Sequence, residues 1–508
     1  MTERLDISAQ RVDGCYFLRQ WSSDPADFTG TSPGAYKHVY TYWKSERTIR
    51  AELEAMIAGA RHKIFIASFL LGDAALLDAL TAAASRLLGG VYVITQLDEQ
   101  RLAKGLQELA DGSDPEPGSD GVDAAIQAQK KRFDQMTRNG IYVRGHLNCH
   151  AKFAVVDDEI ALVTSANLMT SALDFTGENG VVVTVPAEVQ RLARLFGRLW
   201  RTGCAYEARP GQAYRLSKLR EREPWPDGVP APAAAPAPGA IWTDGSEHHI
   251  LAAIQDIVGR AESELLLASF GLTRLKQQHE LLLDPIREAV GRGVRVMLLI
   301  RPRRNLARHL AEATELAQAG VEVYGDTRTH VKAAIADDRH GALFSANFDF
   351  EHGLTSGVEV GCRLDGTPAL ADAARYLRHA IEQATLVYAV RPTHRDLAER
   401  LDADWQARWP LGERVEVEAP AEERAALAQA AEQGPVLFTI PAHGPLELHA
   451  GSRQWRLTPG VLDRYELTRS ASGGGTDSRG ILARWLTTPS GGGRRGVCAT
   501  LIEWAGPG

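Results

Sequence analysis

The sequence contains little cysteine, and its cysteines are scattered. The 508 residues include Cys15, Cys149, Cys204, Cys362 and Cys498, and no two of them form a Cys-x-x-Cys pair. Disulfide-stabilised domains and zinc sites need paired or clustered cysteines. The pattern therefore indicates neither a disulfide framework nor a zinc site.

Long hydrophobic runs are also missing. A membrane-spanning helix needs about 20 consecutive apolar residues, and no stretch of the chain reaches that length. The first residues, Met-Thr-Glu-Arg-Leu-Asp, lack the apolar region of a secretory signal. We therefore expect a cytoplasmic protein without a transmembrane segment.

Positive charge is not in excess. The chain has 57 Lys and Arg against 64 Asp and Glu, which gives a formal net charge of −7. Global charge thus offers no support for nucleic-acid binding, and any surface for a polyanion has to be a local patch. The length allows two to four domains with a large core.

One polar motif is present twice. The first copy comprises His150, Lys152, Asp157, Ser165 and Asn167. The second copy, 180 residues later, has the same spacing and comprises His330, Lys332, Asp337, Ser345 and Asn347. Residues 140–169 align with residues 320–349 without a gap. This repetition indicates two related units.

The motif predicts which side chains share a face. Apolar residues such as Val155 and Val156 indicate a short buried strand. Side chains two positions apart on a strand point the same way, so His150 and Lys152 are expected to share a face. Asp157 falls on the other face and is interpreted as a scaffold or turn residue.

Two such units facing each other bring together two imidazoles, two ammonium groups and two Asn amides. This set suits a phosphodiester, because Lys and Asn donate hydrogen bonds to the non-bridging oxygens and stabilise the transition state. A neutral His can attack phosphorus while a protonated His delivers a proton to the leaving alcohol. Only His titrates close enough to neutrality for both roles.

At these residues the sequence resembles the phospholipase D superfamily, whose signature is His-x-Lys-x4-Asp followed by a Ser-x-Asn element. The resemblance covers roughly residues 40–390. It implies cleavage through a covalent phosphohistidine without metal or organic cofactor, with His150 as nucleophile and His330 as general acid. It further implies that the phosphate is bound, with support from Ser165 and Ser345, by a set of four residues: Lys152, Lys332, Asn167 and Asn347.

A carboxylate that orients a catalytic histidine is also typical of the superfamily. Glu359 lies where that group is expected. The first half has Asn179 at the same register, with Glu178 one position away. The orienting group of the first half is therefore left open between these alternatives.

The order strand, helix, strand, helix, strand in each half predicts an α/β fold. We expect two phospholipase D-like α/β/α units in a pseudo-twofold, bilobal core, with a small β-rich domain at the C-terminus. The expected boundaries are residues 1–222 for the first unit, 223–240 for a Pro/Ala linker, 241–390 for the second unit and 391–508 for a helical connector and the β-rich domain.

Two segments outside the motifs bear on the choice of substrate. The first half has an insertion over residues 111–138, and we expect this segment to lie on the surface near the pocket. A basic segment starting at Arg301 follows a strand, where α/β folds place their sites. It is interpreted either as a contact for a polyanion backbone or as a solvated loop.

The substrate remains open between nucleic acid and phospholipid. The lack of an amphipathic or membrane-spanning segment favours a nuclease that cleaves DNA or RNA. It would act in DNA processing or in defence against foreign DNA, with an ATPase as a protein partner by analogy alone. The alternatives are a phospholipase D or cardiolipin/phosphatidylserine synthase type of enzyme, and a non-catalytic binding or scaffold protein.

Overall fold

The structure is a computed structural model. It describes residues 15–20, 26–43, 45–97, 119–302 and 307–393, and beyond them isolated residues and strands between 396 and 500. The chain divides into two compact units. One contains residues 23–385, and the other contains residues 1–22 with 386–508.

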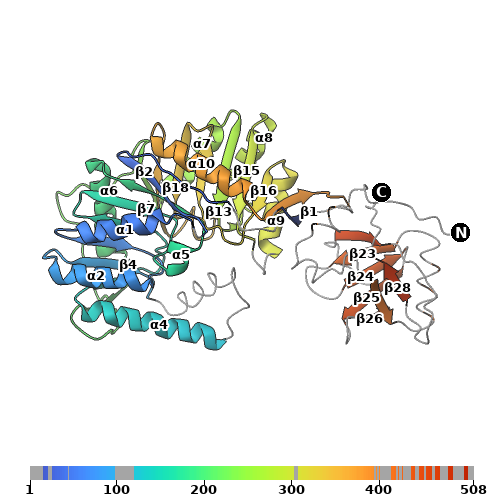
Figure 1. The fold of residues 1–508 in the computed structure, drawn as a ribbon, viewed down its shortest axis with the longest axis horizontal. Coiled ribbons are helices and arrows are strands. Elements are labelled where there is room, and N and C mark those ends of the chain that lie inside the picture. Colours follow the sequence, from blue (N-terminus) through green and yellow to red (C-terminus); the bar gives the residue numbers. More distant parts are fainter. Residues whose placement is uncertain are drawn as a thin grey trace. The chain divides into compact units, whose positions relative to one another are not determined.

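The first half of the larger unit is a mixed sheet with helices on its faces (Figure 1). Its strands are β2 (Tyr36–Thr41), β3 (Ile64–Ala67), β4 (Val91–Thr95), β5 (Tyr142–Gly145), β6 (Phe153–Val156), β7 (Ile160–Thr164), β8 (Glu178–Val183), β9 (Tyr206–Ala208) and β10 (Ser217–Lys218). Its helices are α1 (Thr48–Gly59), α2 (Ala74–Arg86), α4 (Ser119–Arg138), α5 (Thr170–Asp174) and α6 (Pro186–Arg198).

The second half repeats this arrangement. Its main sheet contains β11 (Gly239–Asp244), β12 (Glu247–His248), β13 (Glu264–Ser269), β15 (Arg295–Ile300), β16 (Glu322–Gly325), β17 (Ala333–Ala336), β18 (His340–Phe344) and β20 (Val358–Arg363). A separate small sheet pairs β14 (Leu272–Thr273) with β19 (Phe348–Asp349). The helices are α7 (His249–Arg260), α8 (Leu283–Gly291), α9 (Ala307–Gln318) and α10 (Pro368–Glu382).

The strand orders confirm the duplication. The first sheet runs β5-β4-β3-β6-β7-β8-β2, and the corresponding part of the second runs β16-β15-β13-β17-β18-β20-β11. In both halves the strand that follows the motif histidine (β6 or β17) lies antiparallel beside the strand that follows the first helix (β3 or β13). The α/β fold with two repeats, as expected from the sequence, is thus present.

The core joins the two halves. Helix α6 begins with Pro186, which is favourable in a first helical turn, and buries Leu192, Leu195 and Phe196. These side chains belong to a cluster that also contains Leu266 and Val360 of the second half. Apolar burial of this kind stabilises by roughly 25 cal/mol per Å². The two sheets therefore share one continuous core within this unit.

The start of the chain, expected as part of the first unit, forms a strand of the smaller unit. Strand β1 (Cys15–Arg19) pairs antiparallel with β21 (Leu386–Val390), and both belong to the smaller unit. The apolar side chains of β1 explain the pairing, because Phe17 is buried and its ring centroid lies 4.6 Å from that of Tyr388.

The C-terminal part is β-rich, as expected. Among the described residues it forms one sheet of β22 (Arg414–Glu418), β23 (Val436–Ile440), β24 (Leu446–Ala450), β25 (Arg453–Pro459), β26 (Arg464–Arg469), β27 (Arg479–Ala483) and β28 (Val497–Thr500). The helical connector expected before it falls largely outside the described residues.

The Pro/Ala linker is irregular over most of its length. Its expected end at residue 240 falls inside β11, which starts at Gly239 and pairs with β20. Contacts hold the linker against α6, where Arg191 Nη1 donates to the Ala233 carbonyl at 2.5 Å. The linker is thus attached along the surface of the larger unit.

Candidate active site at the seam of the two halves

Both motif histidines make backbone hydrogen bonds to the opposite half. The His150 N–H donates to the Val358 carbonyl at 2.9 Å, and the His330 N–H donates to the Gly177 carbonyl at 2.7 Å. Each motif histidine is therefore fixed to the start of the last main strand of the opposite half. These backbone contacts place both histidines at the interface between the two halves, which we call the seam.

The two histidine side chains are held crosswise by buried glutamates. His150 Nδ1 lies 2.8 Å from Glu359 Oε1, and His330 Nδ1 lies 2.8 Å from Glu178 Oε1. Each glutamate belongs to the half that does not contain its histidine. Because Nδ1 faces a carboxylate, Nε2 is the ring nitrogen left for chemistry.

The motif serines orient the glutamates. Ser165 Oγ donates to Glu178 Oε2 at 2.5 Å, and Ser345 Oγ donates to Glu359 Oε2. Each serine bonds to the glutamate of its own half. A serine, a glutamate and the histidine of the other half thus form one hydrogen-bonded chain, and the seam contains two such chains.

Of the two alternatives for the first-half orienting group, Glu178 is the one whose side chain contacts a motif histidine. Gly177 and Val358, which bind the motif histidines through their carbonyls, each directly precede a glutamate. The second half therefore has one additional residue between Asn347 and Val358. Asn179 has a different position, and its Nδ2 donates to the Lys332 carbonyl at 3.4 Å.

The two motif lysines are buried beside the histidines. Lys152 is 1% exposed and Lys332 is fully buried. Lys152 Nζ donates to the His150 carbonyl at 2.6 Å, and Lys332 Nζ donates to the His330 carbonyl at 2.9 Å. Burial lowers the pKa of Lys152 to about 8, so that its ammonium form still prevails at neutral pH.

The motif asparagines lie on the loops that follow β7 and β18. The side-chain oxygen of Asn167 accepts from the Leu70 N–H at 3.4 Å. The side-chain oxygen of Asn347 is buried and has no hydrogen-bond partner among the described residues. The Nδ2 groups of both residues stay the predicted donors to a bound phosphate.

The motif aspartates lie in turns, as their spacing predicts. Asp157 has φ of 55° and accepts from the backbone N–H groups of Arg61, His62 and Lys63 at 2.6–2.8 Å. Asp337 has φ of 53° and binds residues 262–264 in the same way. The left-handed conformation is tolerated by Asp better than by most residues. These side chains stabilise the loop before β3 or β13.

The pKa values of the two glutamates are shifted in opposite directions. Burial raises the pKa of Glu178 to about 7. For Glu359 burial acts in the same direction, but His150 and Lys152 outweigh it, and the pKa lies below its usual range. Burial lowers the pKa of His150 and, with help from Lys332 and Lys152, lowers that of His330 much further. His150 thus faces an ionised carboxylate, whereas Glu178 can retain a proton near neutrality.

Phenylalanine rings border both histidines. The Phe69 ring centroid lies 5.1 Å from that of His150, and the Phe270 centroid lies 4.8 Å from that of His330. The preceding serines, Ser68 and Ser269, bind the backbone of the loops after the motif asparagines. The repeated His-x-Lys motif did not point to these four residues, but they belong to triplets that match in the two halves, Ala67-Ser68-Phe69 and Ala268-Ser269-Phe270.

The insertion brings a helix close to the first histidine. In α4, Gln129 Nε2 donates to the Leu71 carbonyl at 2.5 Å, and the Arg132 guanidinium lies against Gly72. The loop that α4 contacts also carries Phe69. Residues 98–118, which include the start of the insertion, lie outside the described residues.

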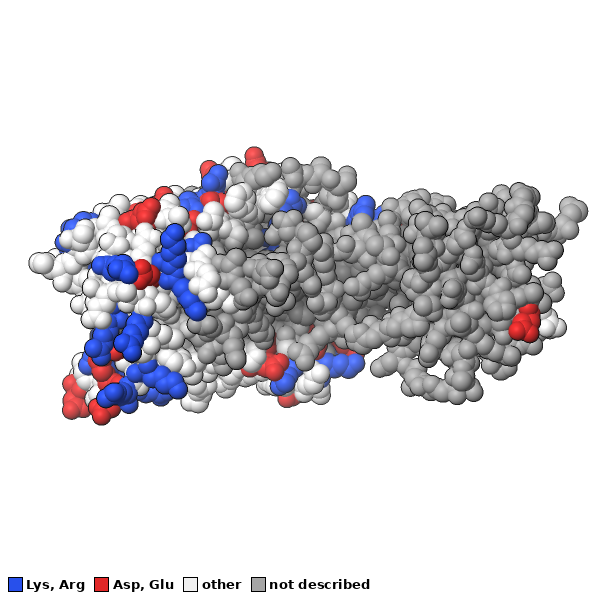
Figure 2. Space-filling view, turned by 90° about the horizontal axis from the view of Figure 1, so that it is seen from below, with Lys and Arg blue, Asp and Glu red and all other residues white. Residues whose placement is uncertain are grey.

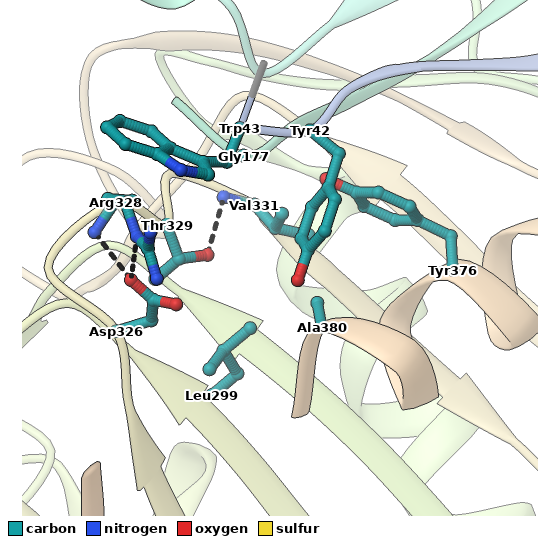
Figure 3. A pocket seen from close by; sticks show the side chains of 10 residues that line it. All are labelled: Tyr42, Trp43, Gly177, Leu299, Asp326, Arg328, Thr329, Val331, Tyr376 and Ala380. Carbon is teal, nitrogen blue, oxygen red and sulfur yellow. Dashed lines mark hydrogen bonds and ion pairs between the residues drawn. The ribbon is translucent and has the colours of Figure 1, made fainter. Parts of the chain in front are cut away.

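A small pocket lies at the seam, on the other face of the segment that carries His330 (Figure 3). Arg328 pairs with Asp326 at 3.3 Å and lies over the Trp43 ring at 4.7 Å from its centroid. Val331 also lines this pocket, and its side chain alternates with those of the motif. The side chains that line this pocket therefore pack around the loop before His330 and stabilise it.

Neither a metal site nor a membrane span emerges from the described part of the chain. No group of three His, Cys, Asp or Glu side chains there has the geometry to hold a metal ion. No helix among the same residues is long and apolar enough to cross a bilayer.

The duplicated fold and its shared histidine–lysine site define a class of proteins in which two α/β repeats build one composite site. A family model described as "Cardiolipin synthase, PLD-like domain" matches residues 53–200 and 254–381, together more than half of the chain. The chain belongs to the phospholipase D superfamily, whose members are in general phosphodiesterases or transferases.

Solved structures resemble the chain at low sequence identity. Phosphatidylserine synthase of Haemophilus influenzae Rd KW20 is 13% identical, with a TM-score of 0.42, over 68% of this chain and 87% of that one. Polyphosphate kinase from Porphyromonas gingivalis has the same identity and TM-score, over 68% of this chain and 46% of that one. Nuc from Salmonella typhimurium, a phospholipase D family member, is 19% identical, with a TM-score of 0.25, over 29% and 95%. No curated protein matches the sequence.

Proposed function

We propose that this protein is a nuclease that cleaves phosphodiester bonds of DNA or RNA through a covalent phosphohistidine. The observation that carries the proposal is the pair of crosswise histidine–glutamate contacts beside two buried lysines. These groups supply a nucleophile, a proton donor and positive charge at one seam. The proposal includes action in the cytoplasm.

The chemistry needs one phosphate bound between the lysines. In a partly buried site an ammonium about 4 Å from a phosphate oxygen contributes roughly 4 kcal/mol at an effective dielectric constant near 20. Lys152 and Lys332 are the ammonium groups, and Asn167 and Asn347 donate further hydrogen bonds. The phosphate oxygens gain further negative charge in the pentavalent transition state, so the positively charged lysines stabilise that state.

We assign the attack to His150 and the proton transfer to His330. His150 Nε2 forms a bond to phosphorus while the bond from phosphorus to the leaving oxygen breaks, and His330 Nε2–H gives its proton to that oxygen. Water then attacks the phosphohistidine and loses a proton to His330, which restores both side chains.

The protonation of the two pairs supports this assignment. A nucleophile has to be neutral, and His150 can donate Nδ1–H to the ionised Glu359 while its Nε2 stays unprotonated. The other pair has to bring a proton, and Glu178, with its pKa raised to about 7 by burial, lets that pair hold one near neutral pH. The bound phosphate offsets the lysine charges that lower the pKa of His330.

A nucleic-acid substrate is favoured by basic side chains of α4. Figure 2 shows Lys and Arg side chains, with Asp and Glu side chains among them, on the side of the molecule that carries α4. Residues of α4 include Lys130, Lys131, Arg132 and Arg138. This helix contacts the loop beside His150, so a polyanion held there could reach the seam.

Phospholipid-headgroup hydrolysis or transfer is the second candidate. Two observations favour it: the description of the matching family model, and the exposure of Leu147 and Phe175 on segments close to the site. The side chains are 37% and 46% exposed. Leu147 lies just before His150 and Phe175 just before Glu178, where apolar groups could contact lipid.

The test is incubation of the purified chain with labelled DNA, RNA and phospholipid vesicles, each in EDTA. We expect cleavage of nucleic acid and no release of lipid headgroup. The His150→Ala variant should be inactive, whereas His62→Ala should retain activity, because His62 is exposed beside Asp157 in the loop before β3. Headgroup release without nucleic-acid cleavage would overturn the nuclease proposal.

A further inference from the structure

Helices α4 and α9 occupy equivalent places in the two halves. They end at Arg138 and Gln318, with the same spacing as the two motifs. The three N–H groups that follow each helix make the same backbone hydrogen bonds in both halves. The register of the helices is therefore the same, and Arg132 of α4 corresponds to Glu312 of α9.

The charge at this position is reversed between the halves. Glu312 is 4% exposed, and its Oε2 accepts from the Lys276 N–H at 2.9 Å, so it stabilises the loop after β14. In the first half the loop after β3 is bound by Gln129 instead, whose Nε2 donates to the Leu71 carbonyl at 2.5 Å. Arg132 is therefore a cation at a position where the second half has a structural carboxylate.

Arg132 lies beside the loop that carries a motif asparagine. A Cβ atom at Gly72 would be 2.6 Å from Arg132 Nη1 and 2.7 Å from Met169 Sδ, so the glycine makes room for the guanidinium. The Gly72 N–H donates to the Leu168 carbonyl at 2.8 Å, and Leu168 directly follows Asn167. The guanidinium is thus next to the loop whose Asn167 is assigned to the scissile phosphate.

The Arg132 side chain has hydrogen-bonding capacity left for a ligand. A guanidinium carries five N–H donors, and the one hydrogen bond that Arg132 makes within the described part of the chain runs from Nη1 to Gln129 Oε1 at 3.3 Å. No carboxylate of the described residues pairs with it. The side chain is partly buried, so a ligand can still reach it. Its planar fork matches the geometry of a phosphate.

We propose that Arg132 binds a second phosphate of a nucleic-acid strand, the neighbour of the scissile phosphate on the part of the strand that stays bound to His150. The inference rests on the proposed function, because it takes His150 as the nucleophile. In an in-line displacement the leaving oxygen is on the side away from the nucleophile, which is the side of His330 and the second half. The retained nucleotide stays with the first half, where α4 carries Arg132.

Nucleoside p-nitrophenyl phosphates test this assignment, because p-nitrophenolate always leaves and the nucleoside is always retained. The parent substrates are thymidine 5′-(p-nitrophenyl phosphate) and thymidine 3′-(p-nitrophenyl phosphate). Each is compared with the analogue that carries a second phosphate on the other hydroxyl of the nucleoside. In the series whose direction the site accepts, we expect the second phosphate to raise kcat/KM about tenfold. The gain should shrink at high salt, because Arg132 is partly exposed.

Variants of Arg132 identify the group that binds the second phosphate. Arg132→Gln should lose the gain, Arg132→Lys should retain part of it, and Arg132→Glu, which introduces the residue of the second half, should turn the gain into a loss. Arg61→Gln is the control, because Arg61 is 65% exposed in the loop before β3 and pairs with Glu159. It should show the gain of the wild type. The gain is a ratio within one preparation, so it does not depend on the amount of folded protein.

The outcomes separate this inference from the proposed function. If the wild type cleaves DNA or RNA but shows no gain in either series, Arg132 has no such role and the proposed function stands. A gain that persists in Arg132→Gln would mean that another group binds the second phosphate, which also overturns the inference. If the wild type cleaves neither DNA nor RNA, the proposed function fails, and this inference fails with it.

Discussion

The crosswise pairing of histidines and glutamates can be tested by separating the two chains of hydrogen bonds. A diester of p-nitrophenol has a leaving group that needs little proton donation. His330→Ala should therefore still release a burst of p-nitrophenolate as the phosphohistidine forms, whereas His150→Ala should not. In this background the burst rate reports on His150 alone.

The structure predicts which glutamate matters to that burst. Glu359 accepts from His150 Nδ1 at 2.8 Å, while Glu178 binds His330, which the background variant lacks. Loss of a hydrogen bond to a charged group costs roughly 1.5–3 kcal/mol, or about tenfold to 150-fold in rate. Adding Glu359→Gln to His330→Ala should slow the burst by this factor, and adding Glu178→Gln should change it less than about threefold.

The assay is stopped-flow absorbance at 400 nm under single-turnover conditions, with about equal amounts of folded protein confirmed by thermal unfolding. The phosphoryl adduct, stable in base and labile in acid, should map to the peptide containing His150. If Glu178→Gln slowed the burst and Glu359→Gln did not, each glutamate would serve the histidine of its own half. An adduct on the peptide with His330 would reverse the assignment of nucleophile and acid.

Four further predictions follow from the same geometry. Nuclease activity should survive EDTA, because the two motif lysines supply the positive charge; strict dependence on added Mg²⁺ or Mn²⁺ would contradict the mechanism. Cleaving the chain within residues 230–238 should leave an active complex of both halves on gel filtration, because they share one core. Asp157→Ala should lower the free energy of unfolding by about 2 kcal/mol, since it loses three backbone contacts in a left-handed turn; activity per folded molecule should remain, and a selective loss of activity would give Asp157 a direct role. Glu178 stays protonated to higher pH in the folded state than in the unfolded state, so its contribution to stability falls as pH rises from its usual pKa through about 7. The Tm of Glu178→Gln minus the Tm of the wild type should therefore be larger at pH 8 than at pH 5. An equal difference at both pH values would refute the raised pKa.

Much of the fold could be predicted because the repeats carry local signals. Apolar residues such as Val155 and Val156 predicted a short buried strand, and the structure has β6 at Phe153–Val156. Alternation predicted that His150 and Lys152 share a face, whereas the structure starts β6 after them, at Phe153; Asp157, interpreted as a scaffold or turn residue, lies in a turn. These features depend on residues that are close in the sequence, because side-chain alternation along a strand and the backbone preferences of a turn are the same in any fold.

The orienting carboxylate of the first half could not be predicted from local sequence patterns. Glu178 and Asn179 were both compatible with the repeat, because a one-residue difference in the loop after Asn347 cannot be located by aligning motifs. The structure identifies Glu178 through the preceding Gly177 carbonyl, which binds His330 of the other half. This contact joins residues 153 positions apart, and no periodic pattern of the sequence indicates it.

The repeated motif predicted from the sequence alone that two similar α/β units each carry a histidine, a lysine and an asparagine, because motif spacing and hydrophobic patterning are local properties. The contact of each histidine with the glutamate of the opposite half and the burial of Arg301 could be seen in the folded protein alone. Hydrogen bonding and burial depend on which segments meet between the two halves, and packing of the shared core sets that arrangement.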